Sequence, residues 1–164
     1  MIKKVLLGLA LISSVSHAEF FAKGNTGLGL IVGGGSLTVG REIQNYTIVG
    51  VSADYFVIDN LSVGLGYMGW FGGTPSLSQV TLPVTYYIPA TKKLHPYGGL
   101  FLRETFVSDG YGDYESYGVR AGVAITLSSK SYLGVGMVQE YYGSGRFQES
   151  SSYTYPEFVF SFSF

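Results

Sequence analysis

The last seven residues of the chain alternate between phenylalanine and other residues, and this pattern limits the fold more than any other feature. Phe158, Phe160, Phe162 and Phe164 occupy every second position up to the end of the sequence. Successive side chains of a β-strand point to opposite faces, so one face would carry all four rings. The other face would carry Glu157, a valine and two serines. The rings must then be covered by a second sheet in a soluble sandwich or by lipid around a membrane barrel.

The first residues have the three parts of an export signal. Lys3 and Lys4 form a basic start, the run 5–12 is apolar, and Ser16-His17-Ala18 offers a small-x-small cleavage site. The apolar run is shorter than the roughly 20 residues that span a bilayer as a helix. We therefore expect a signal peptide over residues 1–18 and one mature domain over residues 19–164.

The composition of the mature chain excludes several classes of protein. There is no cysteine, so neither disulfides nor thiolate metal sites can form. Without Lys3 and Lys4 the chain has 8 basic and 11 acidic residues, a net charge of −3, which gives no nucleic-acid-binding footprint. After the signal no apolar segment approaches helical membrane-spanning length, so a membrane location would require a closed barrel.

The mature sequence repeats one unit, in which about ten alternating residues are followed by turn residues. Eight such segments predict strands within 25–39, 46–58, 61–71, 77–88, 95–106, 115–127 and 131–142, and from 153 to the end. We expect a polar loop over 41–45, a bend or strand end at Gly33-Gly34-Gly35, and a bulge at Pro83, which cannot donate to a strand ladder.

The connections between these segments alternate in character. Those after the second, fourth and sixth segments are short (Asp59-Asn60, 89–93 and 128–130), whereas the others are mostly longer and richer in Gly, Ser and acidic residues. An even number of strands, with short turns on the side of the termini and longer loops opposite, is typical of an outer-membrane barrel. The sequence therefore predicts an all-β, eight-stranded, antiparallel up-and-down transmembrane barrel.

With these features the chain resembles the small eight-stranded outer-membrane barrels of Gram-negative bacteria, the OmpA/OmpX-like class. The residues that carry the resemblance are the signal, the closing segment 158–164 and repeats such as 54–67 and 96–100. The resemblance implies a location in the cell outer membrane. It also implies that Phe160, Phe162 and Phe164 form the signal read by the barrel-assembly machinery. We expect a monomer in contact with outer-membrane lipid, without a cofactor.

Charged residues on the face opposite the apolar one are the best candidates for a functional site: Asp54, Arg103, Arg120, Glu140 and Glu157. An arginine on the lipid face near the bilayer midplane costs about 2–4 kcal/mol, so these side chains should point inward and pair. They would form a charged network that fills a lumen just wide enough for side chains. The alternative is a narrow channel for small solutes, gated by the same pairs.

Aromatic and acidic residues suggest two further surfaces. Girdles at the membrane interfaces explain the tyrosines near strand ends or on the apolar face (Tyr46, Tyr67, Tyr86, Tyr117, Tyr132, Tyr141 and Tyr153), with a sugar-binding surface as the weaker alternative. In the loop 107–114, Asp109, Tyr111, Asp113 and Tyr114 could contact an extracellular partner or a cation. Ordinary turn chemistry accounts equally for that loop.

Catalysis finds little support in the sequence. The mature chain has one histidine, His95, at an expected turn on the side of the termini. Lipid-modifying enzymes with barrels of this size use a histidine at the opposite, outer-leaflet end, so we do not expect an enzyme of that kind. No cluster of residues indicates a metal site. The function predicted from sequence is a structural or surface-interaction role in the outer membrane.

Overall fold

The computed structural model describes residues 20–39, 41–108, 112–143 and 152–163, and the side chains of 37–39 are not described. Eight strands fill these ranges: β1 (Thr26–Val39), β2 (Glu42–Ile58), β3 (Leu61–Phe71), β4 (Leu77–Tyr87), β5 (Leu94–Val107), β6 (Tyr114–Ser128), β7 (Ser131–Tyr142) and β8 (Ser152–Ser163). The expected signal peptide and Phe164 lie outside the described residues. In the ranges described, no helix is long and apolar enough to cross a bilayer.

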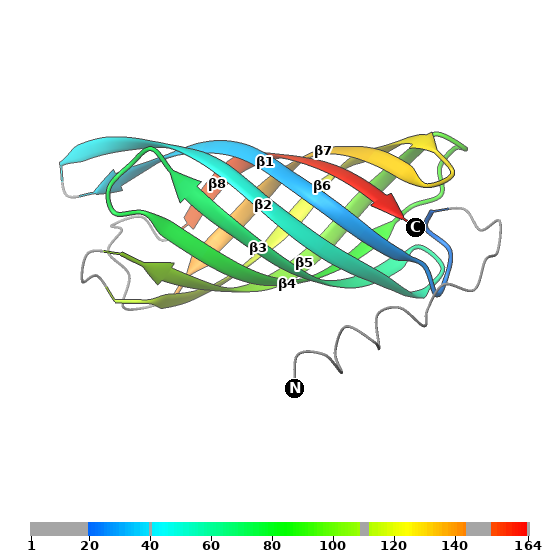
Figure 1. The fold of residues 1–164 in the computed structure, drawn as a ribbon, viewed down its shortest axis with the longest axis horizontal. Helices are drawn as coiled ribbons and strands as arrows, with labels where there is room; N and C mark the ends of the chain where they lie inside the picture. Colours follow the sequence, from blue (N-terminus) through cyan, green and yellow to red (C-terminus); the bar gives the residue numbers. More distant parts are fainter. Residues whose placement is uncertain (1–19, 40, 109–111, 144–151, 164) are drawn as a thin grey trace, which may run out of the picture.

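The strands form a closed antiparallel barrel in chain order. Each strand pairs with the next one along the chain, and β1 also pairs with β8 from Gly27↔Ser163 to Gly33↔Glu157. The predicted eight-stranded barrel is therefore confirmed. Figure 1 shows that β8 ends near the turns that join β2 to β3 and β6 to β7. We call this the turn end of the barrel and the opposite end the loop end.

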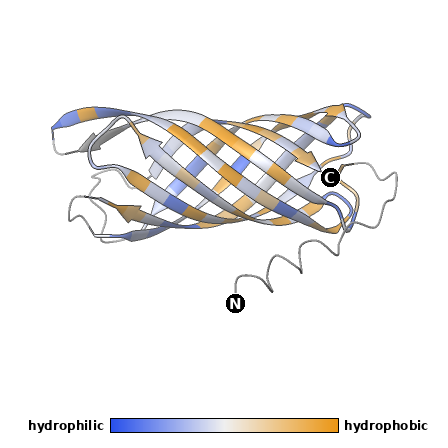
Figure 2. Ribbon diagram, viewed as in Figure 1, coloured by the Kyte–Doolittle hydropathy of each residue, from blue (hydrophilic) through white to orange (hydrophobic). Residues whose placement is uncertain are grey.

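The barrel is apolar outside and mostly polar or aromatic inside. In β4, for example, Leu82 and Val84 are 55% and 43% exposed, whereas Thr81 and Thr85 are buried in the interior. Figure 2 shows hydrophobic and hydrophilic residues interspersed along the strands of the barrel. In β8, Phe158, Phe160 and Phe162 point outward and are 47%, 40% and 38% exposed. The described strands form this one barrel and none of them covers these rings, which excludes the soluble-sandwich alternative.

The hairpin of β1 and β2 is longer than predicted. The polar loop expected over 41–45 is wrong, because β2 begins at Glu42 and pairs with β1 as far as Val39↔Glu42. The glycine run at 33–35 continues β1 without a break. Residues 36–39 and 42–45, which we call the ribbon, pair only with each other and project beyond the loop end (Figure 1). A two-stranded ribbon that projects into water needs no apolar face, so residues 42–45 (Glu-Ile-Gln-Asn) form a strand without the alternating pattern.

Pro83 interrupts a ladder but does not shift its register. The pairs Val63↔Val84 and Gly66↔Thr81 keep the same register between β3 and β4, and the pairs between them are missing. The predicted bulge at Pro83 is therefore wrong: the missing proline N–H leaves a gap rather than an inserted residue. The register shifts instead between Phe56 and Ile58 and between Thr126 and Ser128, beside two of the tight turns.

Candidate functional site

A buried ion pair lies in the interior between β5 and β7. Nη1 of Arg103 donates to Oε2 of Glu140 at 2.6 Å, and the two side chains are 3% and 0% exposed. Tyr155 from β8 joins them, because Arg103 also donates to its hydroxyl at 2.5 Å. Nε of Arg103 donates to Thr81 at 2.8 Å, and Ser116 donates to Oε1 of Glu140 at 2.5 Å. Both charges are thus bound by side chains from five strands of the barrel.

A second ion pair lies between β6 and β8. Nη2 of Arg120 donates to Oε1 of Glu157 at 2.6 Å, and the side chains are 15% and 6% exposed. The guanidinium also lies over the ring of Tyr97, 5.6 Å from the ring centroid. A cation over an aromatic face gains further electrostatic attraction in a desolvated site. The second pair is therefore less enclosed than the first but is still an interior contact.

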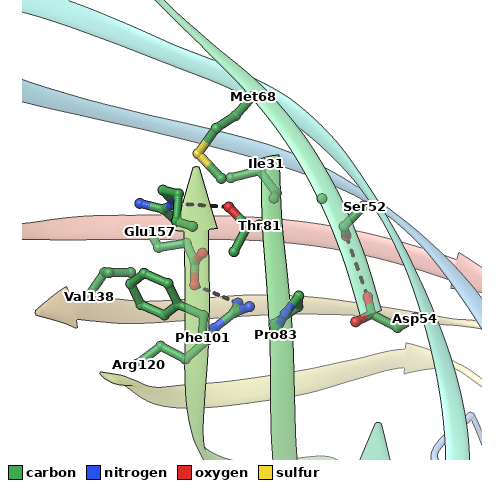
Figure 3. Close-up of a pocket in the computed structure, with 12 residues that line it drawn as sticks. Ile31, Ser52, Asp54, Met68, Thr81, Pro83, Phe101, Arg120, Val138 and Glu157 are labelled. Carbon is green, nitrogen blue, oxygen red and sulfur yellow. Dashed lines mark hydrogen bonds and ion pairs between the residues drawn. The ribbon is translucent and has the colours of Figure 1, made fainter. Parts of the chain in front are cut away.

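Asp54 of β2 belongs to neither pair. Among the described residues its carboxylate makes no salt bridge, and it accepts a hydrogen bond from the hydroxyl of Ser52 at 3.4 Å. Figure 3 shows Ser52 and Asp54 on one side of a cavity and Arg120 with Glu157 on the other. The five charges expected to form one interior network thus divide into two separate pairs and one acid outside them.

The cavity between these groups is small. Its volume is about 20 Å³, measured as space open to the centres of water-sized spheres, and Ile31, Met68, Phe101 and Val138 supply apolar walls beside the charged residues. About 10–15 Å³ on this measure holds one water molecule. The described interior therefore leaves room for one or two waters at this level and for no larger solute.

Aromatic side chains that were not among the predicted interior residues close the interior towards both ends. Towards the loop end, Trp70 is 1% exposed, donates from Nε1 to Gln79 at 2.8 Å, and packs against Tyr46 and Tyr155. Towards the turn end, Tyr87 and Tyr132 meet through their hydroxyls at 2.9 Å. Tyr46 and Tyr132 therefore do not belong to the expected girdle. Their inward parity along β2 and β7 was the signal that could have placed them.

The outward tyrosines follow the prediction more closely. Tyr67, Tyr86, Tyr117 and Tyr141 are exposed on the outer face. Tyr153 differs from them, because it has the inward parity of Tyr155, stacks on that ring and packs against Trp70. Tyr117 and Tyr141 stack on neighbouring strands, with ring centroids 5.7 Å apart.

The candidate residues of the loop 107–114 are placed differently from one another. Asp113 is exposed and accepts the backbone N–H of Val107 at 3.0 Å, so it fastens the loop. Tyr114 begins β6, is 5% exposed and packs against Tyr142, so it is not available as a surface contact. This part of the prediction is wrong because β6 starts one residue earlier than expected, with Tyr114 at an inward position. Asp109 and Tyr111 lie outside the described residues.

The remaining predicted positions are the assembly residues and the histidine. Phe160 and Phe162 face outward on β8, with their ring centroids 6.5 Å apart. His95 lies in β5 at the turn end, is 7% exposed and has its ring 4.4 Å from that of Phe21. It faces the interior, so it is not at a lipid-facing position where a substrate acyl chain could approach it.

Two solved structures resemble this barrel closely in shape. The N-terminal β-barrel domain of Pseudomonas aeruginosa OprF superposes with a TM-score of 0.68 and 15% identity, covering 85% of this chain and 98% of that one. Neisserial surface protein A (NspA) gives a TM-score of 0.67 and 16% identity, covering 85% and 96%. No protein-family model and no curated protein matches the sequence. At these identities the likeness concerns the fold, and that fold is the closed eight-stranded antiparallel barrel of outer-membrane proteins.

Proposed function

We propose that the protein is an integral outer-membrane barrel with a structural and surface-contact role, and that its interior is a plug rather than a conduit. The apolar outer face supports a location in lipid, because a water-exposed barrel would have no reason to present residues such as Leu100 and Leu102, each 64% exposed. The turn end would face the periplasm and the loop end the outside, as is usual when short turns and termini share one end.

The observation that carries the plug is the filled interior. Two ion pairs at 2.6 Å cross the lumen, and the cavity between them measures about 20 Å³. An eight-stranded barrel has an interior that side chains can fill completely. A hydrated ion would have to break at least one of these pairs in order to pass.

The ribbon supports a role at the surface. It extends beyond the barrel wall at the loop end, and Ile43 near its tip is 72% exposed. Together with Asp113 and the loop residues Asp109 and Tyr111, it would present the first surface that an extracellular partner meets. The barrel itself would act as a monomeric anchor in outer-membrane lipid, inserted by the barrel-assembly machinery through Phe160, Phe162 and Phe164.

Planar-bilayer recording tests the plug. Purified barrel that shows heat-modifiable gel migration, a sign of a folded barrel, should give no steady conductance in a planar bilayer. The Arg120→Ala variant should give only brief openings, because the pair of Arg103 and Glu140 still crosses the lumen. Steady conductance of the unmodified protein would contradict the plug.

Shortening the ribbon tests the surface role. Replacing residues 36–43 by Asn-Gly should leave heat-modifiable migration intact, because the strand pairing of the removed, described residues lies within the ribbon, and the change removes one hydrogen bond to the wall, from the N–H of Ser36 to the hydroxyl of Tyr153. The same variant should lose contact-dependent phenotypes of cells that carry the protein, such as adhesion or autoaggregation. The point variant Ile43→Ser separates the apolar tip from the length of the ribbon. Unchanged phenotypes in both variants would argue against a role of the ribbon.

A narrow channel for small solutes is the second candidate function. The position of Asp54 favours it. Asp54 lines the same cavity as Arg120 and Glu157 but belongs to neither ion pair. If Arg120 exchanged Glu157 for Asp54, the guanidinium would keep a carboxylate partner and Glu157 would become the acid outside a pair, so the lumen could open without adding an unpaired charge. Steady conductance that is lost in Asp54→Asn would support this reading over the plug.

A further inference from the structure

The segment that precedes β1 folds back under the turn end of the barrel. Phe20 and Phe21 are 2% and 4% exposed, although they lie before the first strand. We call these two residues the stopper. Two adjacent aromatic residues do not fit the alternating pattern of a strand, so that pattern predicts no position for them.

Four rings from four different strands receive the stopper. Phe56 of β2, Tyr87 of β4, His95 of β5 and Tyr132 of β7 form what we call the socket. Phe21 lies 4.7 Å from Tyr87, 4.4 Å from His95 and 5.4 Å from Tyr132, measured between ring centroids. Phe20 lies 4.9 Å from Tyr132 and 5.9 Å from Phe56, in both cases edge to face. The stopper therefore touches strands from opposite parts of the barrel wall.

Backbone hydrogen bonds hold the segment in this place. The N–H of Asn60, in the turn between β2 and β3, donates to the carbonyl of Phe21 at 2.8 Å. The N–H of Gly24 donates to the carbonyl of Phe56 at 2.8 Å, and the N–H of Lys23 donates to Oδ1 of Asp59 at 2.8 Å. Gly24 has a φ of 89°, a conformation that glycine adopts readily and that turns the chain into β1.

We propose that Phe20 and Phe21 are a tethered stopper that closes the turn-end mouth of the barrel, separately from the ion pairs higher in the lumen. The two rings that fill the mouth belong to a segment outside the strands of the barrel. Local opening of such a segment breaks a few hydrogen bonds and ring contacts but leaves the barrel ladders intact. The seal can therefore be removed without unfolding the wall, and the proposal holds whether the lumen above it is a plug or a channel.

Thiol accessibility tests the seal, because the chain has no cysteine of its own. Thr85→Cys places a reporter in the interior, two residues along β4 from Tyr87 of the socket, at a position that is 2% exposed. Thr105→Cys places a second reporter near the loop end of β5, at a position that is 0% exposed. The reaction rate of each with a charged, water-soluble methanethiosulfonate is measured on folded protein in detergent micelles.

With the stopper intact, the reporter at position 85 should react slowly. In the background Phe20→Ala with Phe21→Ala its rate should rise by about tenfold or more, because reagent can then reach the thiol without local unfolding of the segment. The reporter at position 105 should keep its rate. Lys23→Ala is the matched control, since this exposed side chain lies in the same segment but contributes only its backbone to the anchors.

A conservative background separates sealing from folding. Phe20→Leu with Phe21→Leu keeps apolar volume in the socket and should keep the reporter at position 85 slow. An equal rate at position 85 with and without the phenylalanine rings would overturn the proposal. So would a failure of both the alanine background and a chain lacking residues 19–23 to give a heat-modifiable barrel, because the rings would then be part of the wall rather than a removable seal.

Discussion

Each buried ion pair stabilises the barrel only while both of its members are present. Truncating one member leaves the other charge buried without a partner or full hydration. Glu140 is fully buried and is bound by Arg103, Ser116 and Tyr155. Glu140→Ala should therefore lower the free energy of unfolding by about 3–5 kcal/mol. Urea titration of the barrel in detergent or lipid vesicles measures this loss.

A matched control and a rescue make the measurement specific to the pair. Glu115→Ala removes an exposed carboxylate near the loop end and should change stability by less than about 0.5 kcal/mol. Replacing both charges, as Arg103→Met with Glu140→Leu, should recover much of the loss, since apolar replacements of a buried pair are often neutral. A loss in the double variant as large as in Glu140→Ala would mean that packing rather than the stranded charge causes the effect.

Neutralising the two acids that line the central cavity should change the stability of the barrel by different amounts. Glu157→Gln strands Arg120 and should cost about 2–4 kcal/mol, slightly less than at Glu140 because this pair is more exposed. Asp54→Asn removes a desolvated carboxylate that makes no salt bridge among the described residues, so stability should stay within about 1 kcal/mol or rise. The same urea titration gives both values. Equal losses would show that Asp54 shares the charge of Arg120.

Strand parity predicted which side chains point inward, but it could not predict which of them meet. Arg103 and Glu140 lie on β5 and β7, and their contact passes across the intervening β6. Whether two inward residues face each other depends on the tilt and stagger of the strands around the closed barrel. A single sequence carries no direct signal for that stagger. Because this stagger could not be predicted, the five charges were expected to form one network, whereas they form two pairs with Asp54 outside both.

At the scale of the strand, the alternating pattern located seven strands to within a few residues and failed where a strand had no buried face. β3 and β7 have the predicted limits, and both contact the core along their length. The start of β2 was missed by four residues because 42–45 belong to the ribbon, where no side needs to be apolar. Pairing within a hairpin is enough to fix such a segment as strand.

The approach of β6 to β7 and to the ring of Tyr97 gives a prediction for a single strand position. A Cβ on Gly122 would clash with the carbonyl oxygen of Val135 and would lie 2.6 Å from the hydroxyl of Tyr97. The backbone oxygen cannot move aside without disturbing the ladder, so Gly122→Ala should cost about 1–3 kcal/mol. Gly98 lies next to Tyr97, and a Cβ there meets nothing within 4 Å.

Gly98→Ala is therefore the control, with an expected change of less than about 0.5 kcal/mol. Urea midpoints of both variants and the parent, recorded under one detergent condition, decide the comparison. A stability loss in Gly98→Ala as large as in Gly122→Ala would show that both changes act through glycine's backbone freedom rather than through the close contact.

At the scale of the whole molecule, the barrel has the reverse polarity of a soluble protein. The interior contains ion pairs, hydroxyls and aromatic rings, while large aliphatic side chains cover the outside. In water such an outer surface would drive association, since soluble monomers rarely expose large contiguous apolar patches. In a bilayer the same surface meets acyl chains, and the closed ladder leaves no sheet edge unpaired along the wall.

This distribution of apolar and polar side chains predicts that the stability lost when a charge is placed on the outer face depends on the height of that charge along the barrel. Leu100 lies in the middle of β5 and is 64% exposed, and Ile43 lies on the ribbon and is 72% exposed. Judged by exposure alone, the two positions are alike. In a bilayer, Leu100→Arg places a charge near the midplane and should cost about 2–4 kcal/mol, whereas Ile43→Arg lies beyond the membrane and should cost less than about 1 kcal/mol. Unfolding in phospholipid vesicles measures both. A soluble barrel would tolerate both changes equally, so equal and small losses of stability would contradict the membrane location. A large loss confined to position 100 follows only if hydrocarbon surrounds the middle of the wall.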